Sequence, residues 1–341
     1  MTEINAILLW GLPADSPIAV VRDALQRNGC PVTVIDQRAI LSTEVELVAG
    51  DSVEGWLRFD DRTIDLGTVK AIYVRPQDWR ELPGVVRAGP DSELWRHASA
   101  VHDILLSFAE MTSALALNRP SAMAANSSKP FQAAWIESLG FCIPHTLVTT
   151  DPDAALEFWK QHGRVIYKSM SGIRSIVSQL TPAHRQRFDD IASCPTQFQE
   201  YIPGTEYRAH VVGDEVFACR IVSDADDYRY ASEAVDMQAC ELPDEVAALC
   251  RTLARSMNLL LAGLDLRCTP GGSWYCFEVN SSPAFTCFDA QTGQRVTEAI
   301  ARLLASGEEH VDLAFAEQWP PRQESRSEVR QLSQKVRAEL S

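Results

Sequence analysis

Short apolar runs alternate with helical patterns over the first third of the chain. The runs at residues 6–10 and 71–74 are apolar throughout, which is typical of strands buried on both faces of a parallel sheet. Helical periodicity covers residues 15–27 and 91–114, each time between two short apolar runs. Strands that alternate with helices predict a doubly wound α/β domain over residues 1–117.

The pattern changes beyond this first domain. Residues 118–195 form a second block of short predicted helices and strands. Strand-rich sequence follows over residues 196–310, with hairpins predicted about Gly213-Asp214 and Gly271-Gly272. A chain of 341 residues is long enough for this division into two or three domains.

The last segment, residues 311–341, carries one predicted helix. Ser325 and Glu328 fit a capping box, and the helix that they would open has only a thin apolar seam. Two interpretations stay open at this point. The helix either docks on its own chain or pairs with a second copy in a homodimer.

Charge and composition narrow the class of protein. The chain has 46 Asp and Glu against 31 Lys and Arg, a net charge of −15, so no basic surface for nucleic acid is expected. No apolar run is long enough to cross a membrane, and the first residues lack the pattern of a secretory signal. The nine cysteines include no C-x-x-C pair, which argues against a disulfide framework or a zinc knuckle. We therefore expect a cytoplasmic protein that binds neither membranes nor nucleic acid.

The second predicted hairpin carries candidate metal ligands. If Gly271-Gly272 are its two loop residues, strand alternation places Asp265 directly opposite Glu278, with Asn280 on the same face. Two carboxylates at that distance repel unless a cation lies between them, and hard oxygen ligands suit Mg²⁺ bound together with phosphates. The alternative is a solvated hairpin face, although both strands are otherwise apolar.

Two of the five lysines lie at unusual places. Lys168 ends an apolar strand just before a loop of small residues, where a cation is costly without an anionic partner. Lys129 lies at a predicted helix start, where a cation opposes the helix dipole. Both positions would suit lysines that bind an anion, and a solvent-exposed lysine is the alternative for each.

These segments together resemble the ATP-grasp superfamily over roughly residues 118–305. The likeness is greatest to ribosomal-protein glutamate ligases and to microviridin-type (graspetide) peptide macrocyclases. The residues that carry it are Lys129, Lys168, FQEYIPGTEYRAHVVGDEV at 198–216, DDYR at 226–229, GLDLR at 263–267 and FEVNSSP at 277–283. The resemblance implies a two-lobed α+β ATP-grasp domain after the N-terminal α/β domain, with a central lobe at 118–195 and a C-terminal lobe at 196–310.

The resemblance also implies roles in nucleotide binding. Lys129 and Lys168 would contact the phosphates of ATP, and Lys168 would also lie near the adenine. Glu206 would hold the ribose hydroxyls. The backbone that pairs with the adenine edge would be that of the hinge residues Gln199, Glu200, Tyr201 and Ile202.

Mg²⁺ and the transferring group would have their own residues. The resemblance implies that Asp265, Glu278 and Asn280 hold Mg²⁺. Catalytic contacts would come from arginines. Arg229 would face the transferring phosphoryl group or the acyl phosphate. Arg267 and Arg208 are further candidates for that place.

Arg220 is less suited to that place. The predicted hairpin about Gly213-Asp214 puts Arg220 on the face opposite Glu206 and Arg208.

The chain departs from the family pattern at two places. The loop after Lys168 is shorter than in the glutamate ligases, holds one glycine, and carries Arg174 where those enzymes have small residues. Ala284 stands where a glycine usually follows the proline. Neither departure removes a ligand, so an active enzyme is expected, and the loop resembles the macrocyclase branch more.

The function implied is that of an ADP-forming carboxylate ligase. ATP would phosphorylate a carboxylate, and an amine or a hydroxyl would attack the acyl phosphate. The substrate is expected to be a peptide, with a small molecule left open. Two alternatives stay open: an ATP-grasp kinase that phosphorylates a small molecule, and a non-catalytic nucleotide-binding scaffold.

Substrate specificity would come from the N-terminal domain. Arg75 follows a buried strand at the end where α/β domains bind ligands, and Trp79 and Arg80 come shortly after it. The alternative for Arg75 is a surface arginine stacked on Trp79.

Overall fold

The computed structural model describes residues 6–50, 52–124, 128–169, 178–222 and 236–308. The chain divides into two units, Met1–Glu309 and His310–Ser341. The second unit, and with it the helix predicted in the tail, lies outside the described residues. Within the described residues, no helix is both long and apolar enough to span a bilayer.

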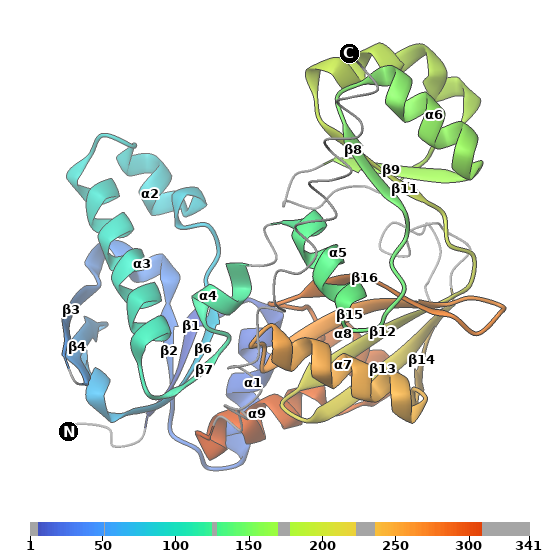
Figure 1. Cartoon of the computed structure of the whole chain (residues 1–341). Coiled ribbons are helices and arrows are strands. Elements are labelled where there is room, and N and C mark those ends of the chain that lie inside the picture. The colour runs from blue at the N-terminus through green and yellow to red at the C-terminus, as the bar shows by residue number, and fades with distance from the viewer. Residues whose placement is uncertain (1–5, 51, 125–127, 170–177, 223–235, 309–341) are drawn as a thin grey trace. The chain divides into compact units, whose positions relative to one another are not determined.

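The N-terminal domain is built on a four-stranded parallel sheet of order β2-β1-β6-β7. Its strands are β1 (Ala6–Gly11), β2 (Val32–Asp36), β6 (Val69–Arg75) and β7 (Leu115–Leu117). Its helices are α1 (Ser16–Arg27), α2 (Pro83–Ala88), α3 (Glu93–Met111) and α4 (Pro120–Met123). Along β1, Leu8 and Trp10 pack into the core that contains α3, while Ile7 and Leu9 pack into the core that contains α1 (Figure 1). Helices on both faces of a parallel sheet confirm the doubly wound fold that the sequence predicts.

A three-stranded antiparallel sheet is inserted between β2 and β6. Its strands are β3 (Glu44–Ala49), β4 (Val53–Phe59) and β5 (Arg62–Asp65). Among the described residues, 3-10 helices are η1 (Gln37–Ser42), η2 (Leu66–Thr68), η3 (Trp79–Glu81) and the longer η5 (Pro182–Ser193). Asp60 and Asp61 form the β4–β5 turn with φ of 46° and 59°. This is the turn geometry that matches the twist of the flanking strands.

The central lobe has an antiparallel sheet of order β10-β9-β11-β8. Its elements are β8 (Thr146–Thr149), α6 (Pro152–His162), β9 (Val165–Ser169), β10 (Ser178–Gln179) and β11 (Thr196–Glu200). A small core of its own includes Ala155, Val165, Phe188 and Phe198. The sheet extends to Glu200, so the central lobe continues beyond residue 195.

The C-terminal lobe has a five-stranded antiparallel sheet of order β14-β13-β12-β15-β16. Its strands are β12 (Thr205–Val212), β13 (Glu215–Val222), β14 (Asp236–Cys240), β15 (Leu261–Cys268) and β16 (Trp274–Asn280). The remaining helices are α5 (Lys129–Ser138), α7 (Asp244–Ser256), α8 (Thr286–Thr292) and α9 (Val296–Ser306). Ala262, Leu264 and Leu266 of β15 pack into a core with α7. The residues between them, Gly263 and Asp265, therefore lie on the other face of the sheet.

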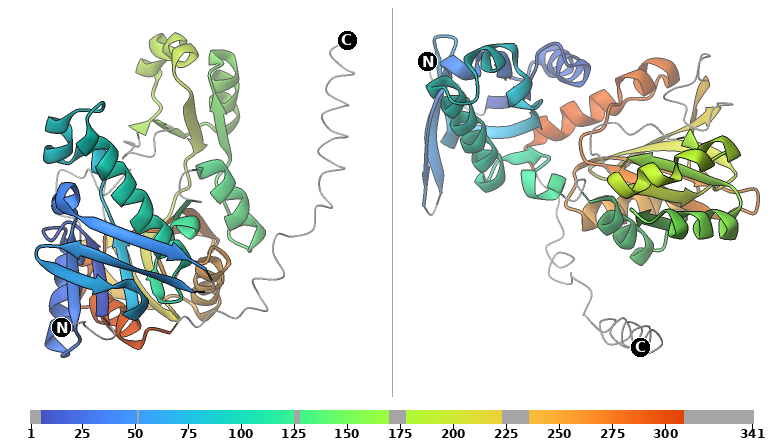
Figure 2. Two further views of the ribbon diagram at one scale, coloured as in Figure 1. Left: turned by 90° about the vertical axis from the view of Figure 1, so that its left-hand side faces the viewer. Right: turned by 90° about the horizontal axis from the view of Figure 1, so that it is seen from above.

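The N-terminal domain and the C-terminal lobe share one hydrophobic core. Helices α1 and α9 lie side by side (Figures 1 and 2), and apolar side chains of both belong to the same cluster. Asn118, which is 2% exposed, joins the two parts with four hydrogen bonds. Its amide nitrogen donates to the carbonyls of Leu261 and Ser281, and its oxygen accepts from the amides of Leu260 and Leu261. Ser281 directly follows β16, so this junction fixes the end of that strand.

Candidate active site

Polar residues alternate along one face of three neighbouring strands of the C-terminal sheet. Directly opposed residues of paired strands point to the same face, so the register fixes which residues meet. The rows across the strands are Glu206–Arg267, Arg208–Asp265–Glu278 and His210–Gly263–Asn280. The predicted ligands Asp265, Glu278 and Asn280 are thus brought together, and the pairing of Asp265 with Glu278 is confirmed.

The hairpin reaches that pairing by a different route from the one expected. Its loop is longer than two residues, since Cys268 pairs with Trp274 and the Thr269 amide donates to the carbonyl of Ser273. This shifts the register by one residue. A β-bulge then adds Phe277 to β16, between the pairs Leu266–Cys276 and Asp265–Glu278, and cancels the shift. The two-residue loop predicted from the sequence is therefore wrong, while the pair inferred from it is right.

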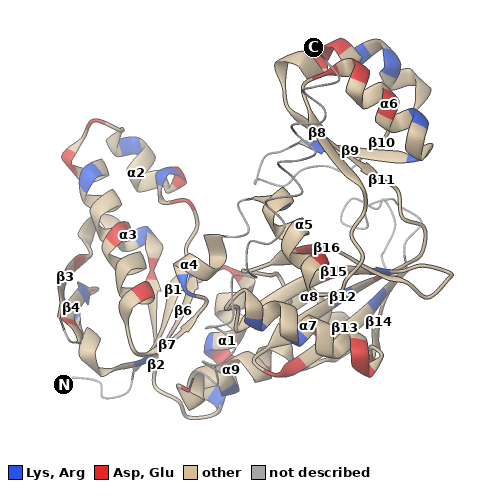
Figure 3. Cartoon of the chain, in the orientation of Figure 1, with Lys and Arg blue, Asp and Glu red and all other residues tan. Residues whose placement is uncertain are grey.

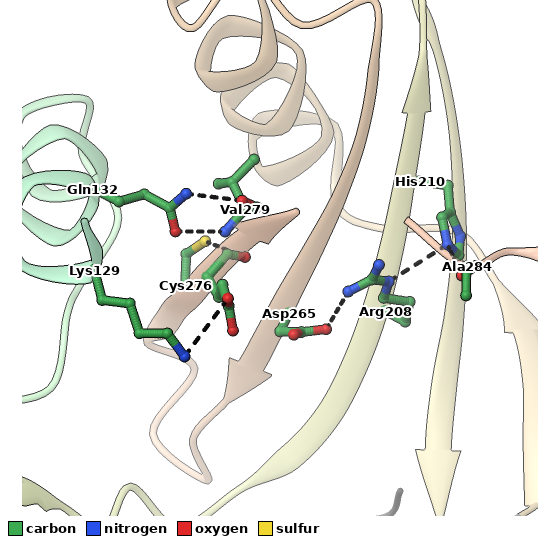
Figure 4. A network of polar contacts seen from close by, with 9 residues as sticks. Lys129, Gln132, Arg208, His210, Asp265, Cys276, Val279 and Ala284 are labelled. Atoms are coloured by element: carbon green, nitrogen blue, oxygen red, sulfur yellow. Dashed lines mark hydrogen bonds and ion pairs between the residues drawn. The ribbon is translucent and has the colours of Figure 1, made fainter. Parts of the chain in front are cut away.

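Asp265 is held by a buried arginine. Arg208 Nη1 donates to Asp265 Oδ1 at 2.5 Å, and the Arg208 side chain is only 6% exposed. Room for the guanidinium comes from Gly263, because a Cβ at that position would lie 2.0 Å from Arg208 Nη2. The sequence left Arg208 as a further candidate near the transferring group, and the structure places it on a metal-ligand candidate (Figure 4).

His210 lies beside this pair and is 1% exposed. Its Nε2 is 3.4 Å from Arg208 Nε and 3.3 Å from the carbonyl oxygen of Ala284. Burial, together with the neighbouring Arg208 cation, holds the pKa of His210 well below its ordinary value. His210 is therefore a neutral imidazole at physiological pH.

Glu278 faces the lysine at the start of α5. Lys129 Nζ is 3.8 Å from Glu278 Oε1, and each side chain is 21% exposed. Helix α5 is anchored there by Gln132, whose side chain donates to the carbonyl of Val279 at 2.8 Å and accepts from its amide at 2.9 Å. Figure 4 shows Gln132 against Val279 and Lys129 on the same helix. Val279 lies between Glu278 and Asn280 in the strand, so Gln132 fixes Lys129 relative to both. Gln132 could not be singled out from the sequence, because a glutamine inside a helical pattern gives no signal of a backbone contact.

The donor set fits Mg²⁺. Two carboxylates and one amide supply hard oxygen ligands of the kind that Mg²⁺ prefers. Mg²⁺ usually binds together with the phosphates of a substrate, and a nearby lysine such as Lys129 would contact those phosphates. Within the described parts of the chain, no residue makes a hydrogen bond with the side chain of Asn280. Its amide oxygen is therefore available as a ligand. The same residues contain no group of three or more His, Cys, Asp or Glu that would hold a metal without further ligands. This suits an ion that shares its coordination with a nucleotide.

The hinge has a stacked aromatic residue at its centre. The Arg164 guanidinium lies 3.4 Å and that of Arg267 5.6 Å from the ring centre of Tyr201. Arg267 also donates to the carbonyl of Ile202 at 2.8 Å and lies 3.5 Å from Glu206 Oε2. The resemblance implied a place for Arg267 near the transferring group. In the structure it contacts the hinge and the residue expected to hold the ribose, and its place near the transferring group stays a prediction.

The first two hinge residues direct their side chains into the central lobe. Gln199 donates to the hydroxyl of Thr146, and Glu200 accepts from the amide of His145 and lies 3.4 Å from His162 Nδ1. These contacts leave the hinge backbone as the part that an adenine could meet. Among the described residues, none accepts a hydrogen bond from the amide of Ile202.

The remaining predicted residues divide into two groups. Lys168 lies in β9, directly opposite Gln197 of β11, and its side chain is partly exposed. Arg174 of the loop after β9 lies outside the described residues. So does the segment 226–229, which contains Arg229, and the structure therefore does not describe the expected catalytic arginine.

The surface expected to select the substrate is largely internal. Arg75 pairs with Asp15 at 2.8 Å and donates to Ser282 and to the carbonyl of Pro283, with 10% of its side chain exposed. Trp79 is a core residue, and Arg80 stacks on it at 4.8 Å. The alternative of Arg75 stacked on Trp79 is therefore wrong. Arg75 instead ties the N-terminal domain to the loop that follows β16.

Comparison with known proteins agrees with this geometry. Residues 138–304 match the family model of the RimK-like ATP-grasp domain. No match is found among curated proteins.

Solved structures similar to this chain include ATP-grasp ligases and a macrocyclase. The ligase PsnB complexed with a minimal precursor variant, Mg and ADP has 24% identity, a TM-score of 0.73 and coverage of 90% of this chain and 99% of its own. A Chryseobacterium gregarium RiPP-associated ATP-grasp ligase with ADP and peptides has 23% identity, a TM-score of 0.77 and coverage of 89% of this chain and 98% of its own. The macrocyclase MdnC of Microcystis aeruginosa, bound with its precursor peptide, has 22% identity, a TM-score of 0.73 and coverage of 88% and 99%. Residues 138–304 thus match a RimK-like ATP-grasp domain, and the chain has the fold of the ATP-grasp ligases.

Proposed function

We propose that this chain is an ATP-dependent, ADP-forming carboxylate ligase that acts on a peptide. The observation that carries the proposal is that Asp265, Glu278 and Asn280 lie together on one sheet face, with Lys129 beside Glu278. Similarity to ligases whose structures contain ADP, Mg and precursor peptides supports the nucleotide, the metal and the peptide substrate.

The proposed reaction has two steps. A carboxylate oxygen of the substrate attacks the γ-phosphorus of ATP, and the bond from that phosphorus to the bridging oxygen breaks to release ADP. An amine or hydroxyl then attacks the acyl carbon, inorganic phosphate leaves, and the nucleophile loses its proton. Mg²⁺, when bound, would supply charge neutralisation for the phosphates.

The chain's own residues bind and orient the reactants. Lys129 and Lys168 hold the phosphates, the hinge backbone at Ile202 receives the adenine, and Glu206 holds the ribose. The Glu206–Arg267 contact fixes the carboxylate beside the hinge, so ribose and adenine are oriented by one cluster. Such positioning, together with electrostatic stabilisation, accounts for most of the catalysis of phosphoryl transfer.

A peptide substrate fits the charge of the protein. The net charge is −15, and Figure 3 shows acidic and basic residues interspersed over the described elements. An acidic protein attracts basic peptides more readily than polyanions. An ATP-consuming enzyme of this kind would work in the cytoplasm, and a homodimer through the tail helix stays a prediction.

Trapping of the acyl phosphate tests the proposal. A pool of peptides that carry basic residues together with Asp and Glu side chains is incubated with the enzyme, Mg·ATP and hydroxylamine. We expect a hydroxamate on a side-chain carboxyl, formed together with ADP. A phosphate ester on a hydroxyl, with no hydroxamate, would instead identify a kinase and overturn the ligase.

A further inference from the structure

One oxygen of Asp265 is already engaged within the protein. Arg208 Nη1 donates to Oδ1 at 2.5 Å, which is short even for a charge-assisted hydrogen bond. The Asp265 side chain is 22% exposed, against 6% for Arg208, so solvent reaches the carboxylate but hardly the guanidinium. An incoming cation therefore meets a carboxylate with one oxygen committed.

The position of Arg208 is built into the sheet. Its guanidinium passes over Gly263, where a Cβ would lie 2.0 Å from Nη2 and 2.7 Å from Cζ. His210 lies 3.4 Å from its Nε, and the ring of Phe288 is 6.0 Å from Cζ. Moving a buried guanidinium away from its carboxylate would leave a desolvated charge, which is strongly destabilising. Arg208 therefore stays on Oδ1 when the metal site fills.

The contact between Arg208 and Asp265 affects which metal ion the site accepts. Ca²⁺ takes about six to eight oxygen ligands and accepts carboxylates through one oxygen or both, whereas Mg²⁺ demands near-octahedral geometry at shorter distances. We propose that Arg208 selects Mg²⁺ over Ca²⁺ by occupying Oδ1 and limiting Asp265 to a single metal-binding oxygen. This inference rests on the metal site of the proposed function and adds a residue that sets its selectivity.

The test compares the affinity for ADP in two different metal ions and does not measure turnover. ADP binding is measured by calorimetry in saturating Mg²⁺ and in saturating Ca²⁺, and the ratio of the two affinities is the readout. Arg208→Leu removes the donor and frees Oδ1. We expect the Mg²⁺/Ca²⁺ ratio to fall at least about 10-fold, mainly through tighter binding in Ca²⁺. Arg208→Lys keeps a donor and should keep most of the ratio.

Two further variants make the result decisive. Gly263→Ala pushes the guanidinium off its place without removing its charge, and it should lower the ratio in the same direction. If Arg208→Leu does not fold, this variant carries the test. Arg220→Leu is the matched control, since Arg220 lies on the same sheet but shares the face of Tyr207, opposite to Arg208. Its ratio should equal that of the wild type.

The outcomes separate the two claims. A wild-type protein whose ADP binding does not depend on a divalent metal would overturn the proposed function and this inference with it. Metal-dependent binding in the wild type, with an unchanged ratio in Arg208→Leu or in a Gly263→Ala variant that folds, would overturn only the role of Arg208.

Discussion

Replacing Gln132 by leucine should uncouple helix α5 from the strand that carries two candidate metal ligands. Gln132 is 3% exposed and makes both of its hydrogen bonds with the backbone of Val279. Leucine has a similar volume but leaves the amide and the carbonyl of Val279 buried without partners. Each such orphaned group costs about 1–3 kcal/mol. For the two groups we therefore expect a loss of about 2–6 kcal/mol in the free energy of unfolding.

The chain contains a matched control for this loss. Gln37 is 1% exposed and makes the same two contacts with the backbone of Gln77, at 2.7 and 2.8 Å, in the N-terminal domain. Gln37→Leu should destabilise the protein by a similar amount in urea unfolding followed by circular dichroism. Only Gln132→Leu should also weaken Mg·ADP binding in calorimetry, because only Gln132 places Lys129 beside Glu278.

Comparison of the two variants decides the point. Equal losses of Mg·ADP affinity would show that stability alone governs binding. Unchanged affinity in a destabilised Gln132→Leu would show that the position of α5 does not matter for the site. Either result would refute the reasoning.

The other predictions need simpler measurements. Glu278→Gln should fold normally but lose at least about 100-fold in ATP turnover, the scale of a lost electrostatic contact, and near-normal turnover would remove Glu278 from the site. Mg·ADP at about 100 times its dissociation constant should add about 2.7 kcal/mol of stability. In a thermal shift assay, Lys168→Ala should reduce that gain far more than Lys160→Ala, whose lysine is exposed and pairs with a neighbouring glutamate on α6. Since burial lowers the pKa of His210 in the folded state, the unfolded chain binds the extra proton and stability falls as the pH drops below about 6.5. Urea unfolding at about pH 7 and about pH 5 should show this loss, and His210→Asn should show a weaker pH dependence than the wild type.

Local alternation was enough to predict the polar face of the second hairpin. Asp265, Glu278 and Asn280 lie two residues apart or directly opposite one another, so strand periodicity alone brings them together. The bulge at Phe277 could not be foreseen, because it depends on how the hairpin loop closes. The predicted pairing of Asp265 with Glu278 is right only because the loop and the bulge shift the register in opposite directions.

Contacts between distant segments were beyond the sequence. The pairing of Arg208 with Asp265 requires β12 to lie beside β15, 57 residues later in the chain, and no local pattern encodes that order. Arg75 shows the converse limit. Its place at the end of a parallel strand favoured ligand binding. In the structure, the Arg75 guanidinium instead pairs with Asp15 after β1 and donates a hydrogen bond to Ser282 in the loop after β16.

The candidate metal ligands and the hinge support one central claim, that a substrate carboxylate attacks the γ-phosphorus of ATP. The direct measurement uses peptides whose Asp and Glu carboxylates carry heavy oxygen, with verified turnover and mass analysis of the products. The account predicts that one labelled oxygen appears in inorganic phosphate for each bond formed, because the attacking oxygen leaves with the phosphoryl group. Unlabelled phosphate, or label in AMP, would contradict the acyl-phosphate ligase.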